Sequence, residues 1–202
     1  MFDLDRETVL IVVLFILVIG ISVKMYTESD MFNLRCIISR VDGKTYCVRD
    51  RRQLKTAADL LAKVTQKCQA LVVYVKERYP THEDVQFLVT NFSPERISET
   101  LPTSEHTAYS ENKGEKIAFC LNKAKQDNER LIDLNTLTFV AIHELAHCMT
   151  QAEGHKQVFW QNFKFLLKNA KEAGIYNPVD YKQSPAEYCG MKISDNPYYD
   201  LK

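Results

Sequence analysis

The sequence predicts an α+β domain that follows one membrane-spanning helix. An uncharged apolar run near the N-terminus predicts the helix. Beyond this run, β-prone stretches are followed by helical patterns with apolar residues three and four apart, which together predict a mixed fold. The 202 residues are 46% hydrophobic, enough for one compact core and an appendage. We therefore divide the chain into an anchor at 1–24, a tether at 25–33 and a domain at 34–202.

Residues 8–23 contain only two polar side chains, Thr8 and Ser22, and no charge. At about 1.5 Å per residue these sixteen residues span roughly 24 Å, so the flanking Lys24 and Tyr26 would sit at the membrane interface. A signal peptide is the alternative. Acidic residues outnumber Arg6 before the run, and no small-x-small cleavage pattern follows it, so we expect an uncleaved single-pass anchor.

Basic residues around this run predict its orientation. Arg6 precedes the run, whereas Lys24, Arg35 and Arg40 follow it, which places the C-terminal domain in the cytoplasm. The six cysteines include no CxxC pair, and we expect them to be reduced thiols. This group consists of Cys36, Cys47, Cys68, Cys120, Cys148 and Cys189.

The first part of the domain alternates turn signals with periodic runs. Asp42-Gly43 between two β-prone runs predicts a hairpin over 35–49, followed by a solvated turn at the basic cluster 49–52. Apolar residues at helical spacing predict a long helix over 53–79, which Pro80 ends, and a shorter helix over 83–92. Residues 93–114 show no period and predict a surface loop.

The second part begins with a short strand over 116–121 and a polar loop. Asp133 or Asn135 then caps a helix that contains two of the five histidines, and a second amphipathic helix after His155 ends before Gly174. The tail from 175 onward has little regular period. His82 and His106 lie outside the motif described next, and we expect both at the surface.

The motif that carries chemistry is His-Glu-Leu-Ala-His, which begins at His143. On a helix, His143 and His147 lie one turn apart on the same face and can bind one cation together. Glu144, at the edge of that face, could serve as the general base that activates a water. The alternative is an amphipathic core helix whose histidines only form hydrogen bonds.

From 116 onward, the strand, the variable loop, HELAH, a further histidine and the pair Phe159-Trp160 resemble the WLM and SprT-like zinc metallopeptidases. The resemblance covers roughly 116–170. It implies a zincin-like fold and a Zn²⁺ ion held by His143, His147 and His155. It also implies that the strand at 116–121 is a sheet edge that borders the cleft and pairs with an extended substrate.

One residue near His155 and two residues in the tail leave alternatives for the metal ligands and the catalytic groups. Glu153 could replace His155 as the third ligand, although Gly154 can turn the chain so that His155 reaches the metal. Residues 188–191 look similar to a Met-turn. There Met191 would lie beneath the metal and Tyr188 would donate a hydrogen bond to the oxyanion of a tetrahedral intermediate.

These features predict a membrane-anchored zinc endopeptidase that acts on protein or peptide substrates. A membrane-tethered binding module with a structural or vestigial zinc is the alternative. Nucleic acid is an unlikely partner, because 26 basic residues balance 26 acidic residues and no global positive field exists.

Overall fold

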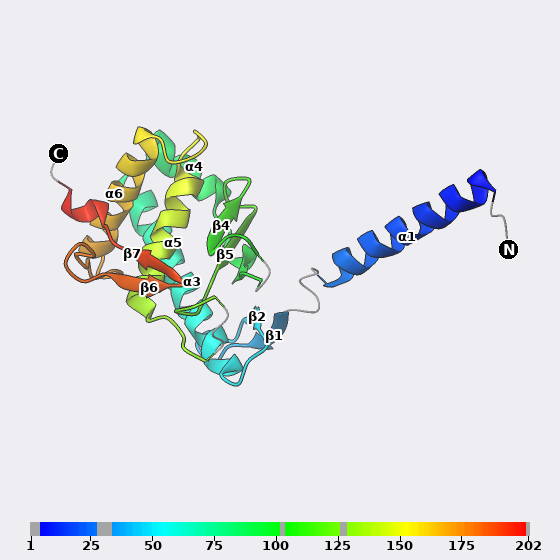
Figure 1. The fold of residues 1–202 in the computed structure, drawn as a ribbon. Coiled ribbons are helices and arrows are strands. Elements are labelled where there is room, and N and C mark those ends of the chain that lie inside the picture. The colour runs from blue at the N-terminus through cyan, green and yellow to red at the C-terminus, as the bar shows by residue number, and fades with distance from the viewer. Residues whose placement is uncertain (1–4, 28–33, 102–103, 126–128, 201–202) are drawn as a thin grey trace.

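In a computed structural model of the protein, the described residues are 5–27, 34–101, 104–125 and 129–200. Figure 1 shows a helix, α1, at the N-terminus and a mixed α/β body formed by the rest of the chain. The α+β class is therefore confirmed. Of the predicted tether, 25–27 belongs to α1, and 28–33 lies outside the described residues.

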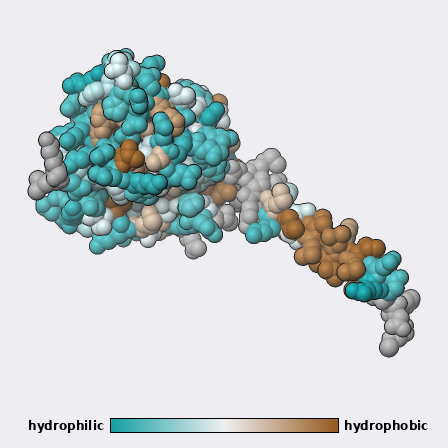
Figure 2. All heavy atoms as spheres, turned by 90° about the horizontal axis from the view of Figure 1, so that it is seen from above, coloured by the Kyte–Doolittle hydropathy of each residue, from teal (hydrophilic) through white to brown (hydrophobic). Residues whose placement is uncertain are grey.

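Helix α1 (Arg6–Thr27) is long and apolar enough to cross a membrane, and none of its apolar stretch is buried. Figure 2 shows this helix as a continuous hydrophobic rod, whereas the visible face of the domain is mostly hydrophilic. An N-terminal signal sequence has the same properties. The apolar segment itself is thus confirmed, and its retention as an anchor stays a prediction.

Four helices form the centre of the domain. Helix α3 (Leu54–Arg78) buries its apolar stripe against α5 (Leu134–Met149), and α5 also contacts α4 (Glu83–Asn91) and α6 (Gln157–Glu172). All four helices agree with the predicted ones. The end of α6 is a Schellman motif, in which Gly174 has a φ of 67°, its N–H donates to Lys171, and Ile175 N–H donates to Ala170.

The predicted hairpin is present as β1 (Leu34–Ile38) and β2 (Thr45–Arg49), and Gly43 takes a positive φ in its loop. The solvated turn predicted at 49–52 is only partly correct. Arg49 and Arg51 are buried, and both form ion pairs with the buried carboxylate of Glu99. This cluster fastens the hairpin to the next sheet.

That sheet corrects two predictions. Residues 93–114 are not merely a loop, because they contain β3 (Ile97–Glu99) and β4 (Ala108–Glu111). The strand predicted at 116–121 exists as β5 (Lys116–Phe119), but it is central rather than an edge: the order is β3-β5-β4, with β3 parallel and β4 antiparallel to it. Strands β3 and β4 are therefore the two edges. The four residues of β4 are too few to show the alternation of apolar and polar side chains by which a strand is predicted from sequence.

The tail contains a second small hairpin, β6 (Ala186–Tyr188) and β7 (Met191–Ile193). Both residues of its turn, Cys189 and Gly190, have positive φ (50° and 81°), as a type I′ turn requires. In Figure 1 this hairpin lies beside α5. Its residues Tyr188, Met191 and Ile193 form one wall of a cavity beside His143.

The expectation of six reduced cysteines is wrong. Cys36 and Cys47 face each other across the β1–β2 ladder and form a disulfide. A second disulfide joins Cys120, just after β5, to Cys189 in the tail hairpin, across 69 residues of sequence. Cys68 and Cys148 are free and buried, and burial raises the pKa of both thiols to about 12. These two cysteines pack in the core as small apolar side chains.

Candidate metal centre

Helix α5 fixes the first two histidines. Its N-cap is Asp133, one of the two residues predicted for this position. The Asp133 carboxylate accepts a hydrogen bond from the N–H of Thr136. Most of its side chains are buried in the core, whereas His143 and His147 are half-buried and lie on the remaining face. Their ring centroids are 5.0 Å apart, as expected for residues one turn apart.

His155 reaches the same point from the segment after α5. The helix ends at Met149, and Gly154 has a φ of 72°, a conformation that favours glycine. The Nε2 atoms of His155 and His143 are 3.1 Å apart. One ligand atom from each of the three histidines falls within 4.8 Å of the others.

The 3.1 Å separation of the His143 and His155 nitrogens is compatible with a tetrahedral zinc. Zn–N bonds of about 2.0–2.1 Å would place two ligand nitrogens roughly 3.3 Å apart. Burial, and the proximity of the other imidazoles, lower the pKa of His143 to about 3. Burial and His155 similarly lower the pKa of His147 to about 4, so both rings are neutral at physiological pH with a lone pair free for a metal.

Glu153 does not join the cluster. Among the residues that the structure describes, His143, His147 and His155 form the one group with this ligand spacing, although Glu153 lines the adjoining cleft. Cys148 turns away from the cluster, with its sulfur 3.8 Å from the Ser110 hydroxyl. As third ligand, His155 therefore fits better than Glu153.

The pair Phe159-Trp160 on α6 supports the histidines, a task that sequence patterns did not assign. The Phe159 ring is fully buried, and its centroid lies 4.9, 4.4 and 4.6 Å from those of His143, His147 and His155. The indole Nε1 of Trp160 donates a hydrogen bond to the backbone carbonyl of His155 at 3.1 Å. The aromatic pair thus holds the three imidazoles in place.

Glu144 is buried beside the histidines and lines the cavities on both sides of them. Burial raises the pKa of its carboxyl to about 8. A divalent cation nearby would favour the ionised form and act against this shift. A proton acceptor at a metal site must lie next to the ligands and border a cavity. The position of Glu144 meets both requirements.

The cleft beside Glu144 has a volume of about 410 Å³. One wall is strand β4, which contributes Ala108, Tyr109 and Ser110, and the other is the histidine cluster. His106 also lines the cleft but stays exposed and outside the cluster, whereas His82 stacks on Phe165. The edge strand at the histidines is thus β4.

Tyr188 lies near the site, but its hydroxyl is already engaged. The oxygen accepts a hydrogen bond from the Cys120 N–H at 3.1 Å and donates its one hydrogen to the Thr107 carbonyl at 3.1 Å. The side chain is fully buried. In this arrangement Tyr188 joins the tail hairpin to the sheet, and it has no hydrogen left for an oxyanion.

Met191 is half exposed, with 52% of its surface accessible, rather than packed beneath the histidines. It lines an apolar cavity of about 300 Å³ together with Tyr188, Ile193 and Glu144. The expected Met-turn therefore corresponds to a β-turn whose methionine borders a cavity next to Glu144.

The chain is similar to viral proteins. It is 27% identical over 191 residues to the uncharacterised protein R325 of Acanthamoeba polyphaga mimivirus, which covers 93% of each chain. Over 74 residues it is 35% identical to the uncharacterised protein 136R of Invertebrate iridescent virus 6, covering 37% of this chain and 40% of that protein. Over 64 residues it is 38% identical to the uncharacterised protein 042R of Invertebrate iridescent virus 3, covering 32% and 39%.

No family model matches the chain, and no solved structure matches it significantly. The similarity to R325 extends over nearly the full length of both chains. The chemistry of this protein must therefore be argued from its own residues.

Proposed function

We propose that the protein is a membrane-anchored zinc metalloendopeptidase. The observation that carries the proposal is the cluster of three histidines, with ligand atoms within 4.8 Å, beside the buried Glu144 in an open cleft. Three imidazoles leave a fourth position for water, as in catalytic rather than structural zinc sites. The resemblance of HELAH, His155 and Phe159-Trp160 to the WLM and SprT-like peptidases supports the same chemistry.

A Zn²⁺ held by these histidines would acidify a water and polarise the carbonyl of the scissile amide. Glu144 accepts the proton of the attacking water, because its carboxylate lies next to the ligands and faces the cavities. The same carboxyl then returns the proton to the leaving amine. Phe159 and Trp160 keep the imidazoles oriented during both steps.

The substrate is an extended chain that pairs with β4. This strand is at the edge of its sheet and lines the cleft opposite the histidines. An extended peptide can add to such an edge through main-chain hydrogen bonds, which bind many sequences alike. Unfolded proteins and flexible segments supply such chains.

The experiment uses the full chain in detergent micelles, loaded with zinc. We expect about one zinc per chain and cleavage of an unfolded protein such as casein. Replacing Glu144→Gln keeps the zinc and lowers the rate at least about 100-fold, because general acid–base catalysis contributes about that much.

Glu153→Gln is the matched control, since it removes a second carboxylate from the same cleft and should keep the activity. Full activity in Glu144→Gln would refute the assignment. A zinc-loaded protein that cleaves no unfolded chain would indicate a structural metal instead.

A further inference from the structure

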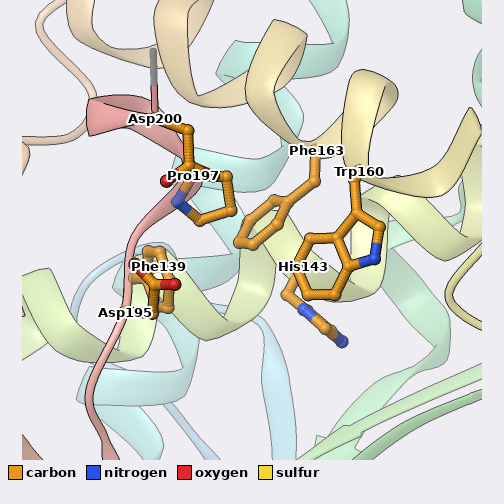
Figure 3. A pocket seen from close by; sticks show the side chains of 7 residues that line it. All are labelled: Phe139, His143, Trp160, Phe163, Asp195, Pro197 and Asp200. Carbon is orange, nitrogen blue, oxygen red and sulfur yellow. The ribbon is translucent and has the colours of Figure 1, made fainter. Parts of the chain in front are cut away.

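A separate cavity of about 300 Å³ opens beside His143, on the side of α6. Figure 3 shows its walls: α5 contributes Phe139 and His143, α6 contributes Trp160 and Phe163, and the C-terminal segment faces them. We call this cavity the aromatic pocket. Its lining residues are Phe139, His143, Trp160, Phe163, Asp195, Pro197 and Asp200.

The walls of the aromatic pocket are mainly rings. Phe139 and Phe163 are buried with centroids 5.3 Å apart, and the Trp160 ring lies 6.4 Å from that of Phe163. Trp160 keeps 45% of its surface accessible, although it is a large aromatic residue of the domain. Such a surface gains free energy when another apolar group covers it.

The carboxylates of Asp195 and Asp200, at the rim of the aromatic pocket, are already paired with lysines and do not require a cationic ligand. Lys182 approaches Asp195 at 3.0 Å and Asp200 at 3.5 Å. The ammonium of Lys164 donates to the backbone carbonyl of Asp200, so two ammonium groups accompany two carboxylates. Because these charges balance, the aromatic rings are the main determinant of which ligand the pocket binds.

We propose that the aromatic pocket binds an aromatic side chain of the substrate, close to the scissile bond. The link is His143, which lines the pocket and also belongs to the histidine cluster. A peptide held at the cluster therefore has a neighbouring residue within reach of the pocket. Phe139, Trp160 and Phe163 surround an aromatic ring in offset or edge-to-face contact. This proposal rests on the proposed function.

Trp160 supplies the readout, because it is the one tryptophan in the chain. The zinc-loaded Glu144→Gln protein, full length in micelles, is titrated with two acetylated peptides that differ only by Phe or Ala at one position. We expect the Phe peptide to bind at least about tenfold more tightly and to shift the tryptophan emission, as burial of one large apolar side chain implies. Equal affinities of the two peptides would overturn the proposal.

Variants locate the binding surface, with a fluorescein-labelled Phe peptide and anisotropy as the measurement. Trp160→Ala should weaken binding at least about fivefold, whereas Val73→Ala, a similarly exposed apolar site on α3, should change nothing. Zinc content is measured first, because Trp160 also contacts the backbone of His155. Phe163→Leu, a milder change within the same pocket, should also weaken binding.

Met191→Ala tests the neighbouring cavity. If this change abolishes the preference for Phe while Trp160→Ala and Phe163→Leu do not, the aromatic ring sits beside Met191 and the proposal is wrong.

Mapping the cleavage sites in casein tests the aromatic pocket and the peptidase activity independently of each other. Aromatic residues enriched at one fixed position from the cut support the pocket. Cleavage without such enrichment overturns the pocket and leaves the peptidase intact. Absence of all cleavage, together with a preference for Phe in the titration, overturns the peptidase and leaves the pocket as a binding site.

Discussion

At the scale of single residues, a substitution of Tyr188 distinguishes a structural role of its hydroxyl from a catalytic role. Its hydroxyl bridges Cys120 and Thr107 inside the protein. Tyr188→Phe should therefore lower the free energy of unfolding by only about 0.5–1.5 kcal/mol, because the hydroxyl loses its hydrogen bonds while the Cys120 N–H keeps its own bond to the Thr107 carbonyl at 2.8 Å. The specific activity of the folded enzyme should stay within about twofold. A loss of kcat of about 100-fold, with unchanged stability, would restore the role of oxyanion donor.

Substitutions of His155 and Glu153 test which of the two residues is the third metal ligand. His155→Ala should weaken zinc binding by at least about 100-fold in a competition with a chelator, because one of three protein ligands is lost. Glu153→Gln should leave the zinc affinity unchanged, since this carboxylate lies outside the cluster. The reverse ranking would make Glu153 the third ligand.

At the scale of elements, length decides what the sequence reveals. The helices α3 and α6 show apolar stripes over 25 and 16 residues, and their ends follow from Pro80 and Gly174. Strands β3 and β4 have three and four residues, too few for a period, and they depend on pairing with β5. For the same reason the edge beside the cleft could not be assigned to β4 before the fold was known.

The tail hairpin is another element that the sequence alone does not show, and it depends on the Cys120–Cys189 disulfide. We expect a Cys120→Ala/Cys189→Ala variant to lose about 2–4 kcal/mol of stability, because this bond closes a long loop. Amide hydrogen exchange should rise most in β6 and β7, which this bond ties to the end of β5. The corresponding change at Cys36 and Cys47, far along the chain, is the control. Equal protection of β6 and β7 in both variants would contradict this dependence.

At the scale of the whole molecule, the local motif was predictable and the cross-links were not. His143, Glu144 and His147 follow from helical spacing, and Gly154 explains why His155 returns to them. The disulfides join residues whose proximity is set by strand register and by a contact across 69 residues, which spacing does not encode. Because structural disulfides are rare in the cytosol, these two bonds weaken the expectation of a cytoplasmic domain.

The disulfides and the basic residues predict opposite sides of the membrane. Arg6, against Lys24, Arg35 and Arg40, is a small bias, whereas two disulfides form readily in oxidising compartments alone. We therefore expect the domain to face the oxidising side when the chain is made in a eukaryotic cell. Glu105→Asn creates an Asn-His-Thr glycosylation acceptor at an exposed position. The variant should gain one glycan, seen as a mobility shift that a glycosidase removes. An unglycosylated variant whose six thiols all react with an alkylating reagent when the cells are lysed in denaturant without a reductant would instead place the domain in the cytoplasm.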